Sequence, residues 1–173
     1  AADYNKDGVV DAGTEMTYAH AYYASGFDKG GKTNYLETVT RAFLTGRETI
    51  TSAKGQKLGW NGRNGGKGIT KQAAIICSNW EKVIAEAVFK YAGSVYKDLE
   101  NMKENTDDAK MFGKYVKHWG ERKGFALALE AGKADRSAIA NKLTGLMGYG
   151  PWLPNMSQVV DVSANGNYVK DES

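Results

Sequence analysis

The stretch from Asp107 to Gly132 reads DDAKMFGKYVKHWGERKGFALALEAG, and its pattern decides the fold class. Apolar side chains recur at steps of three and four residues, which is the period of a helix with one buried face. Thr106 supplies an N-cap, the two aspartates after it complement the helix dipole, and Gly132 supplies an end signal. The pattern predicts one long helix that packs against the rest of the chain through Met111, Tyr115, Trp119, Ala126 and Leu129.

Four further segments show the same helical period, at 14–25, 34–51, 69–102 and 137–147, and the last can start as early as Ala134. In the second of these, Leu36, Val39, Ala42, Phe43 and Ile50 are expected to face inward. No alternating strand pattern and no repeated βα unit is found, although Val159–Val162 can form a short final element and 165–173 is expected to fray. The sequence therefore predicts an all-α bundle of about five helices.

The chain of 173 residues fits one domain with one core, which we assign to 1–173. Its net charge of +3 is too small for an electrostatic nucleic-acid platform. No segment approaches the roughly 20 apolar residues of a membrane-spanning helix. The single cysteine, Cys77, excludes an intrachain disulfide and is expected to be a buried small apolar residue.

A calcium loop is the strongest local motif, in the sequence Asp3-Tyr4-Asn5-Lys6-Asp7-Gly8-Val9-Val10-Asp11. Oxygen-bearing side chains alternate along it, and a glycine stands where an EF-hand loop turns sharply. The final bidentate position is Thr14, and Glu15 follows one residue late. The alternative is an Asp/Asn/Gly turn with no ion. The predicted Ca²⁺ ligands are Asp3, Asn5, Asp7, Asp11 and Glu15, with the backbone carbonyl of Val9.

A second candidate site combines His118 and Glu121, which share one face of the long helix. His20 is the only other imidazole, and Arg47 can point into a polar pocket or into water. A zinc site needs three or four ligands, so two residues do not complete one. The sequence leaves open a structural His–Glu pair, with Arg47 or Arg122 balancing the carboxylate, a transition-metal or ligand site, and catalysis.

Four segments resemble a family of bacterial secreted or lipid-anchored proteins known as a domain of unknown function, with a layout similar to imelysin-like (peptidase M75-like) proteins. They are AFLTGRETI, WEKVIAEAVFKY, HWGERKGFALAL and LMGYGPWLP, and the acidic loop DYNKDGVVD extends the likeness over 3–154. The family signature has glycine two residues before its histidine. Here that residue is Val116, which departs from the metal and peptidase pattern.

The resemblance implies a helical bundle of two related halves, of which this chain would be the C-terminal one. Its regions would be the calcium loop at 3–15, the helical bundle at 14–147, and a Pro/Trp capping loop and tail at 148–173. The expected location is periplasmic or at the cell surface. The expected function is a non-enzymatic protein that binds structural calcium and takes part in metal or nutrient uptake. The alternatives are a metallopeptidase-like enzyme that uses His118 and Glu121, and a structural half-domain that needs an N-terminal partner.

Overall fold

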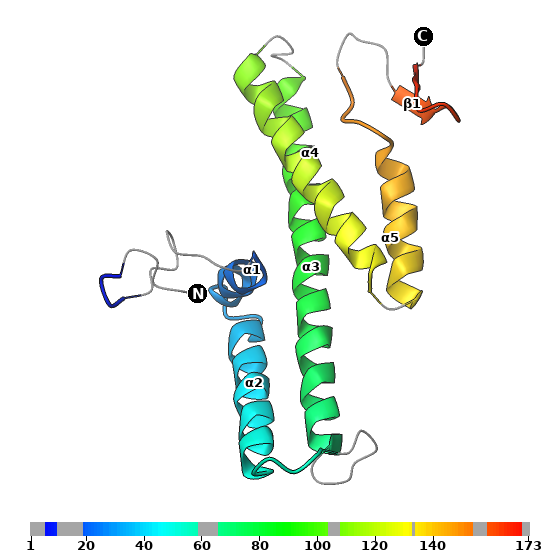
Figure 1. Ribbon diagram of the computed structural model, residues 1–173. Coiled ribbons are helices and arrows are strands. Elements are labelled where there is room, and N and C mark those ends of the chain that lie inside the picture. The colour runs from blue at the N-terminus through cyan, green and yellow to red at the C-terminus, as the bar shows by residue number, and fades with distance from the viewer. Residues whose placement is uncertain are drawn as a thin grey trace. The chain divides into compact units, whose positions relative to one another are not determined.

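The computed structural model describes residues 6–9, 19–58, 66–103, 108–132, 134–153 and 159–170. Within these ranges the chain forms five helices and one antiparallel hairpin of two short strands, which confirms the all-α prediction (Figure 1). The elements are α1 (Ala19–Asp28), α2 (Tyr35–Ser52), α3 (Gly66–Met102), α4 (Ala109–Glu130), α5 (Ala134–Met147), β1 (Val159–Val162) and β2 (Tyr168–Lys170).

The chain divides into two compact units, Ala1–Val83 and Ile84–Ser173. The long helix α3 contributes its first part to the N-terminal unit and its second part to the C-terminal unit. No helix within the described ranges is both long and apolar enough to cross a membrane.

In the N-terminal unit, α1 ends at Asp28, whose carboxylate also starts α2. Oδ1 of Asp28 accepts the backbone N–H of Tyr35 at 2.9 Å, and Oδ2 accepts that of Leu36 at 2.8 Å. These are two of the N–H groups that a helix start leaves without an intrahelical partner. Asn34, at the cap position, makes no side-chain cap bond and instead donates to Glu37. An aspartate of the preceding helix therefore does the work that local sequence assigns to the cap residue.

Small residues bring α2 close to α3. A Cβ placed on Gly46 would lie 3.8 Å from the Cβ of Gln72, and one placed on Gly68 would lie 3.8 Å from Thr49. The inward face of α2 is the line of Val39, Ala42, Gly46 and Thr49, of which Val39 and Ala42 are buried.

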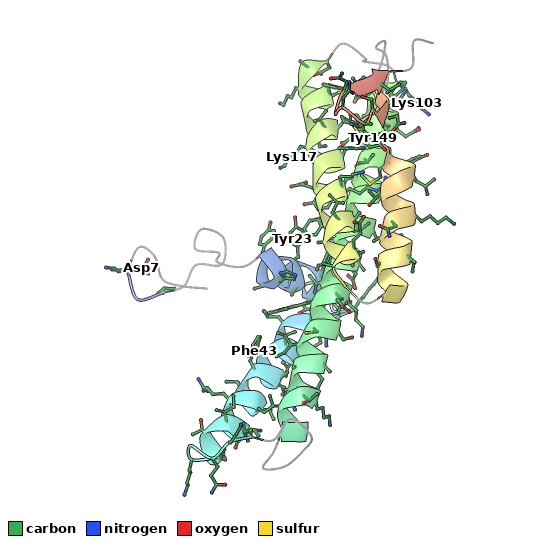
Figure 2. The ribbon with its side chains drawn as sticks, turned by 45° about the vertical axis from the view of Figure 1, so that its right-hand side comes forward. Asp7, Tyr23, Phe43, Lys103, Lys117 and Tyr149 are labelled. Atoms are coloured by element: carbon green, nitrogen blue, oxygen red, sulfur yellow. The ribbon has the colours of Figure 1, made fainter. Side chains whose placement is uncertain are left out.

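This close packing overturns part of the predicted core. The larger residues of α2, Leu36, Phe43 and Ile50, are exposed. They lie seven residues apart along one line of the helix, beside the line that meets α3. Phe43 still touches the N-terminal unit at its edge, where its ring lies 5.9 Å from that of Trp80 (Figure 2). Cys77 is likewise exposed, because it occupies an outward position of α3.

In the C-terminal unit, α4 runs antiparallel to the second part of α3, and α5 runs antiparallel to α4 (Figure 1). One apolar cluster joins all three helices through Val88, Ala126, Leu129 and Ala140. A second cluster joins α3 and α4 near their connection and contains Val95, Met102 and Tyr115. The predicted inward residues Tyr115, Ala126 and Leu129 are confirmed as buried.

The first turn of α4 is capped by Asp108, whose Oδ1 accepts the backbone N–H groups of Lys110 and Met111 at 2.8 and 3.0 Å. The predicted cap, Thr106, lies outside the described residues. The helix ends at Glu130, so the single helix predicted over 107–132 is confirmed to within two residues at each end.

Lys123 of α4 fixes the end of α5. Its ammonium group donates to the backbone oxygens of Thr144 at 3.3 Å and Gly148 at 2.8 Å, which are carbonyls that the helix end leaves unpaired. Gly148 has a φ of 68°, a conformation that favours glycine and turns the chain away from the helix.

The final hairpin contradicts the expectation that the chain frays from 165 onward. Asp161 pairs with Val169 and Val162 with Tyr168. The turn between the strands is held by Ser163, whose hydroxyl donates to the carbonyl of Asn167 at 2.9 Å.

Candidate functional site at the α3 and α4 seam

The most unusual group in the described residues is Asp98, a carboxylate with only 4% of its surface exposed in the middle of the α3–α4 seam. Its Oδ2 lies 2.5 Å from Nδ1 of His118 on α4. Its Oδ1 lies 3.4 Å from Nζ of Lys114, one turn earlier on the same helix. A buried carboxylate is costly unless it is paired, and α4 supplies a partner for each oxygen.

Aromatic rings cover the other sides of His118. The ring of Tyr91 lies 5.8 Å from the imidazole at a tilted angle, and the ring of Phe125 stacks on Tyr91 at 5.9 Å. The His118 side chain keeps 19% of its surface exposed, and that of Lys114 keeps 59%. The polar contact is therefore buried on the aspartate side and open to solvent on the lysine side.

The polar layer separates the two apolar clusters of the unit. Along α3, the seam positions Val88, Tyr91, Val95, Asp98 and Met102 follow one another at alternating steps of three and four residues, the repeat of helices that pack along their length. Val88 belongs to one cluster, and Val95 and Met102 belong to the other. Asp98 thus occupies a core position in an otherwise apolar and aromatic seam.

The arrangement restricts the chemistry of His118. An ionised carboxylate only accepts hydrogen bonds, so the nitrogen of His118 that faces Asp98 carries a proton. A carboxylate on one imidazole nitrogen fixes the orientation of the ring and leaves the second nitrogen as the one that can accept a proton or bind a metal. The described contacts of this layer consist of the Asp98 partners and the surrounding rings.

The four residues of the predicted polar site belong to different units. His118 and Glu121 lie one turn apart on α4 in the C-terminal unit, and both are partly buried. His20 and Arg47 belong to the N-terminal unit, where Arg47 is exposed on α2. The carboxylate found on His118 is that of Asp98 and not that of its helical neighbour Glu121.

Asp98 and Lys114 are absent from the sequence-based site, although the sequence holds a signal for the first. A single aspartate that falls on the apolar repeat of a long helix must be buried, and a buried carboxylate needs a cation from a facing element. The repeat indicates that such a partner exists. It does not identify the partner, because the pairing of α3 with α4 sets which side chains meet.

His20 has an apolar environment in the N-terminal unit. Its ring lies 5.3 Å from that of Trp80, and burial lowers the pKa of the imidazole below its ordinary value. Burial disfavours the charged form because a cation loses hydration in an apolar setting. His20 is therefore a packing residue that is held neutral.

Tyr115 is the most deeply buried aromatic side chain of the C-terminal unit, at 1% exposure. Burial raises the pKa of its hydroxyl, and a hydrogen bond with the backbone of Trp152 opposes part of that rise. This bond ties the segment after α5 to the core under α4. The side chain of Trp152 itself remains half exposed.

The predicted calcium loop falls mostly outside the described residues, which include only Lys6, Asp7, Gly8 and Val9 of it. These four are exposed, and Oδ1 of Asp7 accepts the backbone N–H of Val9 at 2.8 Å. Across the described ranges, no three His, Cys, Asp or Glu side chains converge as they would around a metal ion. The predicted ligands Asp3, Asn5, Asp11 and Glu15 lie outside those ranges.

Comparison of the chain with protein-family models, with curated proteins and with solved structures finds no match.

Proposed function

We propose that this chain is a non-enzymatic, extracytoplasmic helical protein that binds a structural calcium ion through 3–15. The observation that carries the calcium part is the turn at Asp7, Gly8 and Val9. Gly8 has a φ of 88°, in the region that favours glycine, and it stands at the glycine position of an EF-hand loop. The Asp7 carboxylate holds the backbone N–H of Val9 at 2.8 Å.

The charge pattern around this turn supports a cation. Asp3, Asp7 and Asp11 place three carboxylates within nine residues, and like charges at such spacing repel one another unless a cation neutralises them. The carbonyl of Val9 and the side chain of Asn5 add neutral oxygens, which suit Ca²⁺ as a hard cation. Glu15 would complete the ligand set from the start of the following helix.

Thermal unfolding with calcium and with excess EDTA tests the proposal. A ligand that binds only the folded state at about 100 times its Kd adds roughly 2.7 kcal/mol, so the midpoint of the N-terminal unit should rise by several degrees. The variant Asp7→Ala should abolish the response, while Asp161→Ala, an exposed aspartate of the hairpin, should keep it. An identical midpoint with calcium and with EDTA would rule out a tightly bound ion.

The extracytoplasmic location and the role in metal or nutrient uptake rest on the segments AFLTGRETI, WEKVIAEAVFKY, HWGERKGFALAL and LMGYGPWLP. Fractionation of the source cells, with immunodetection of this chain, tests the location. Recovery with the periplasmic or surface fraction is expected. Recovery with cytoplasmic markers alone would contradict the location and leave the calcium proposal untouched.

A second candidate is a metallopeptidase-like enzyme that uses His118 and Glu121. The contact with Asp98 favours it, because a carboxylate on Nδ1 is a common outer partner of a metal-binding histidine. Metal analysis of the purified protein decides the premise. Less than about a tenth of an equivalent of zinc, iron or copper would remove it, since a resident metal should approach stoichiometric occupancy.

A third candidate is a half-domain completed by the N-terminal half of the same precursor. The exposed line of Leu36, Phe43 and Ile50 on α2 supports it, because large apolar side chains repeated along one helical line suit a further helix. Co-expression with the upstream region and size-exclusion chromatography test it. A stable monomer that ignores the upstream region would contradict this reading.

A further inference from the structure

We propose that the contact between Asp98 and His118 is a specificity lock, which selects the face that α4 turns toward α3. The inference concerns the C-terminal unit alone and is independent of the proposed calcium site. It rests on the burial of Asp98, on its two partners from α4, and on the composition of the α4 surface.

The surface of α4 carries two neighbouring strips that could each meet α3. They are about a quarter of a turn apart, as follows from 3.6 residues per helical turn. The strip that does meet α3 contains two polar residues at its centre, His118 and Arg122, between apolar ends. The neighbouring strip is wholly apolar over the same length. The first strip is Met111, His118, Arg122, Phe125 and Leu129; the second is Phe112, Val116, Trp119 and Ala126.

Apolar burial alone does not explain why the first strip faces α3. Turning α4 by about a quarter of a turn would exchange His118 and Arg122 for apolar side chains such as Trp119 in the seam. Hydrophobic burial is non-directional and roughly proportional to area, so it would favour or tolerate that arrangement. Phe112, Val116 and Trp119 are already packed against the cluster near the α3–α4 connection, so only a rotation separates the two packings.

Asp98 distinguishes these arrangements. In the observed packing, both of its oxygens meet cationic or proton-donating groups of α4, at 2.5 Å from His118 and 3.4 Å from Lys114. In the rotated packing, the carboxylate would face Trp119 and Val116 and would have no such partner. A buried, unpaired charge is strongly unfavourable, so the rotated packing is excluded by the aspartate and not by the apolar contacts. This is the role of a single polar residue in a helical seam, which fixes an arrangement at a cost in stability.

The discriminating variant replaces both members of the pair with leucine, Asp98→Leu with His118→Leu. Both α4 strips then become acceptable to α3. We expect far-UV circular dichroism and the thermal midpoint to be retained or raised. We also expect the near-UV signal of the surrounding aromatic residues to fall by about half or more, with several-fold stronger binding of a hydrophobic dye, which are marks of lost unique packing. A matched control, Lys97→Leu with Lys117→Leu, adds two leucines at exposed positions of the same helices and measures the dye binding that surface leucine alone produces.

A second pair of variants tests the contact itself. The exchange Asp98→His with His118→Asp restores an Asp–His pair with its members on opposite helices. Each single substitution should lower the thermal midpoint and the near-UV signal, and the exchange should recover most of both. An exchange no better than the worse single variant would overturn the proposal. A leucine pair that keeps the wild-type near-UV spectrum would also overturn it, and so would one that unfolds the helices.

Discussion

The two parts of α3 are packed in different ways. In the N-terminal unit, α3 meets α2 through Gly46, Thr49 and Gly68, so the helices approach closely and little side-chain area lies between them. In the C-terminal unit, α3 meets α4 through Tyr91, Val95 and Met102, which interdigitate with large residues of α4.

The difference shows in what each unit buries. The buried apolar residues described in the N-terminal unit are Ala24, Val39, Ala42 and Val83, whereas the C-terminal unit also buries tyrosine, methionine and leucine. Burying an apolar side chain contributes about 25 cal/mol per Å², so larger side chains contribute more. The deeper core also surrounds the buried Asp98, whose charge is tolerated because α4 supplies its partners.

The largest loss is expected from His118→Ala, which leaves the Asp98 carboxylate buried without its closest partner. Breaking a buried pair in this way costs about 3 to 5 kcal/mol. Lys114→Ala, at the exposed side of the same carboxylate, should cost less than about 1 kcal/mol. Urea unfolding of the two variants measures both effects. Equal losses would show that Lys114 is the main counterion and that the contact with His118 is secondary.

A core truncation in the C-terminal unit ranks next. Leu129→Ala should lower the unfolding free energy by about 3 kcal/mol, because it removes apolar contacts and leaves a cavity among Val88, Ala126 and Ala140. Leu36→Ala on α2, where the side chain is 41% exposed, should change stability by no more than about 0.5 kcal/mol. A comparable loss at Leu36 would mean that this residue is covered in solution.

A smaller effect is expected at the start of α2. Asp28→Ala removes the acceptor for the N–H groups of Tyr35 and Leu36 and should cost about 1 kcal/mol, as for the loss of a helix cap. Asn34→Ala, at the cap position itself, should cost less than about 0.5 kcal/mol, because its side chain makes no cap bond. Hydrogen exchange at the first turn of α2 measures both, and the reverse order would restore the local cap predicted from sequence.

The same carboxylate gives a pH dependence. Burial alone would raise the pKa of Asp28, but the hydrogen bonds from Leu36, Thr33 and Tyr35 outweigh it and lower the pKa below 3.8. The folded state therefore binds the proton less tightly than the unfolded state. The stability contribution is fully present above the unfolded pKa and is lost as the pH falls through the folded pKa. Unfolding measured between about pH 6 and pH 2 should lose this contribution in wild type and show none in Asp28→Ala.

The smallest effect is a gain. Gly124→Ala on α4 should stabilise the protein by up to about 1 kcal/mol, because a Cβ there meets nothing within 4 Å and glycine is a poor helix former. Gly46→Ala on α2 would place its Cβ 3.8 Å from that of Gln72, an ordinary contact, and should also be tolerated. Thermal unfolding compares the two. A marked loss at Gly46 would show that α2 lies closer to α3 than the described contacts indicate.

The helices were predictable because their signals are local. The apolar period of Ile69–Met102 and the acidic start of α4 depend on residues within one or two turns, and both predicted helices are confirmed. The inward residues were less predictable on α2. Leu36, Val39 and Phe43 are equally apolar in sequence, and only the close approach of α3 at Gly46 and Gly68 decides that Val39 is buried.

The candidate site separates the two levels of information most clearly. The sequence by itself determined that His118 lies on a long amphipathic helix and that an aspartate interrupts the apolar repeat of α3, since both follow from spacing along one helix. Only the tertiary structure decided that Asp98, and not Glu121, meets His118. Residues twenty apart on antiparallel helices are brought together by the rotation and register of packing, and these depend on the whole seam.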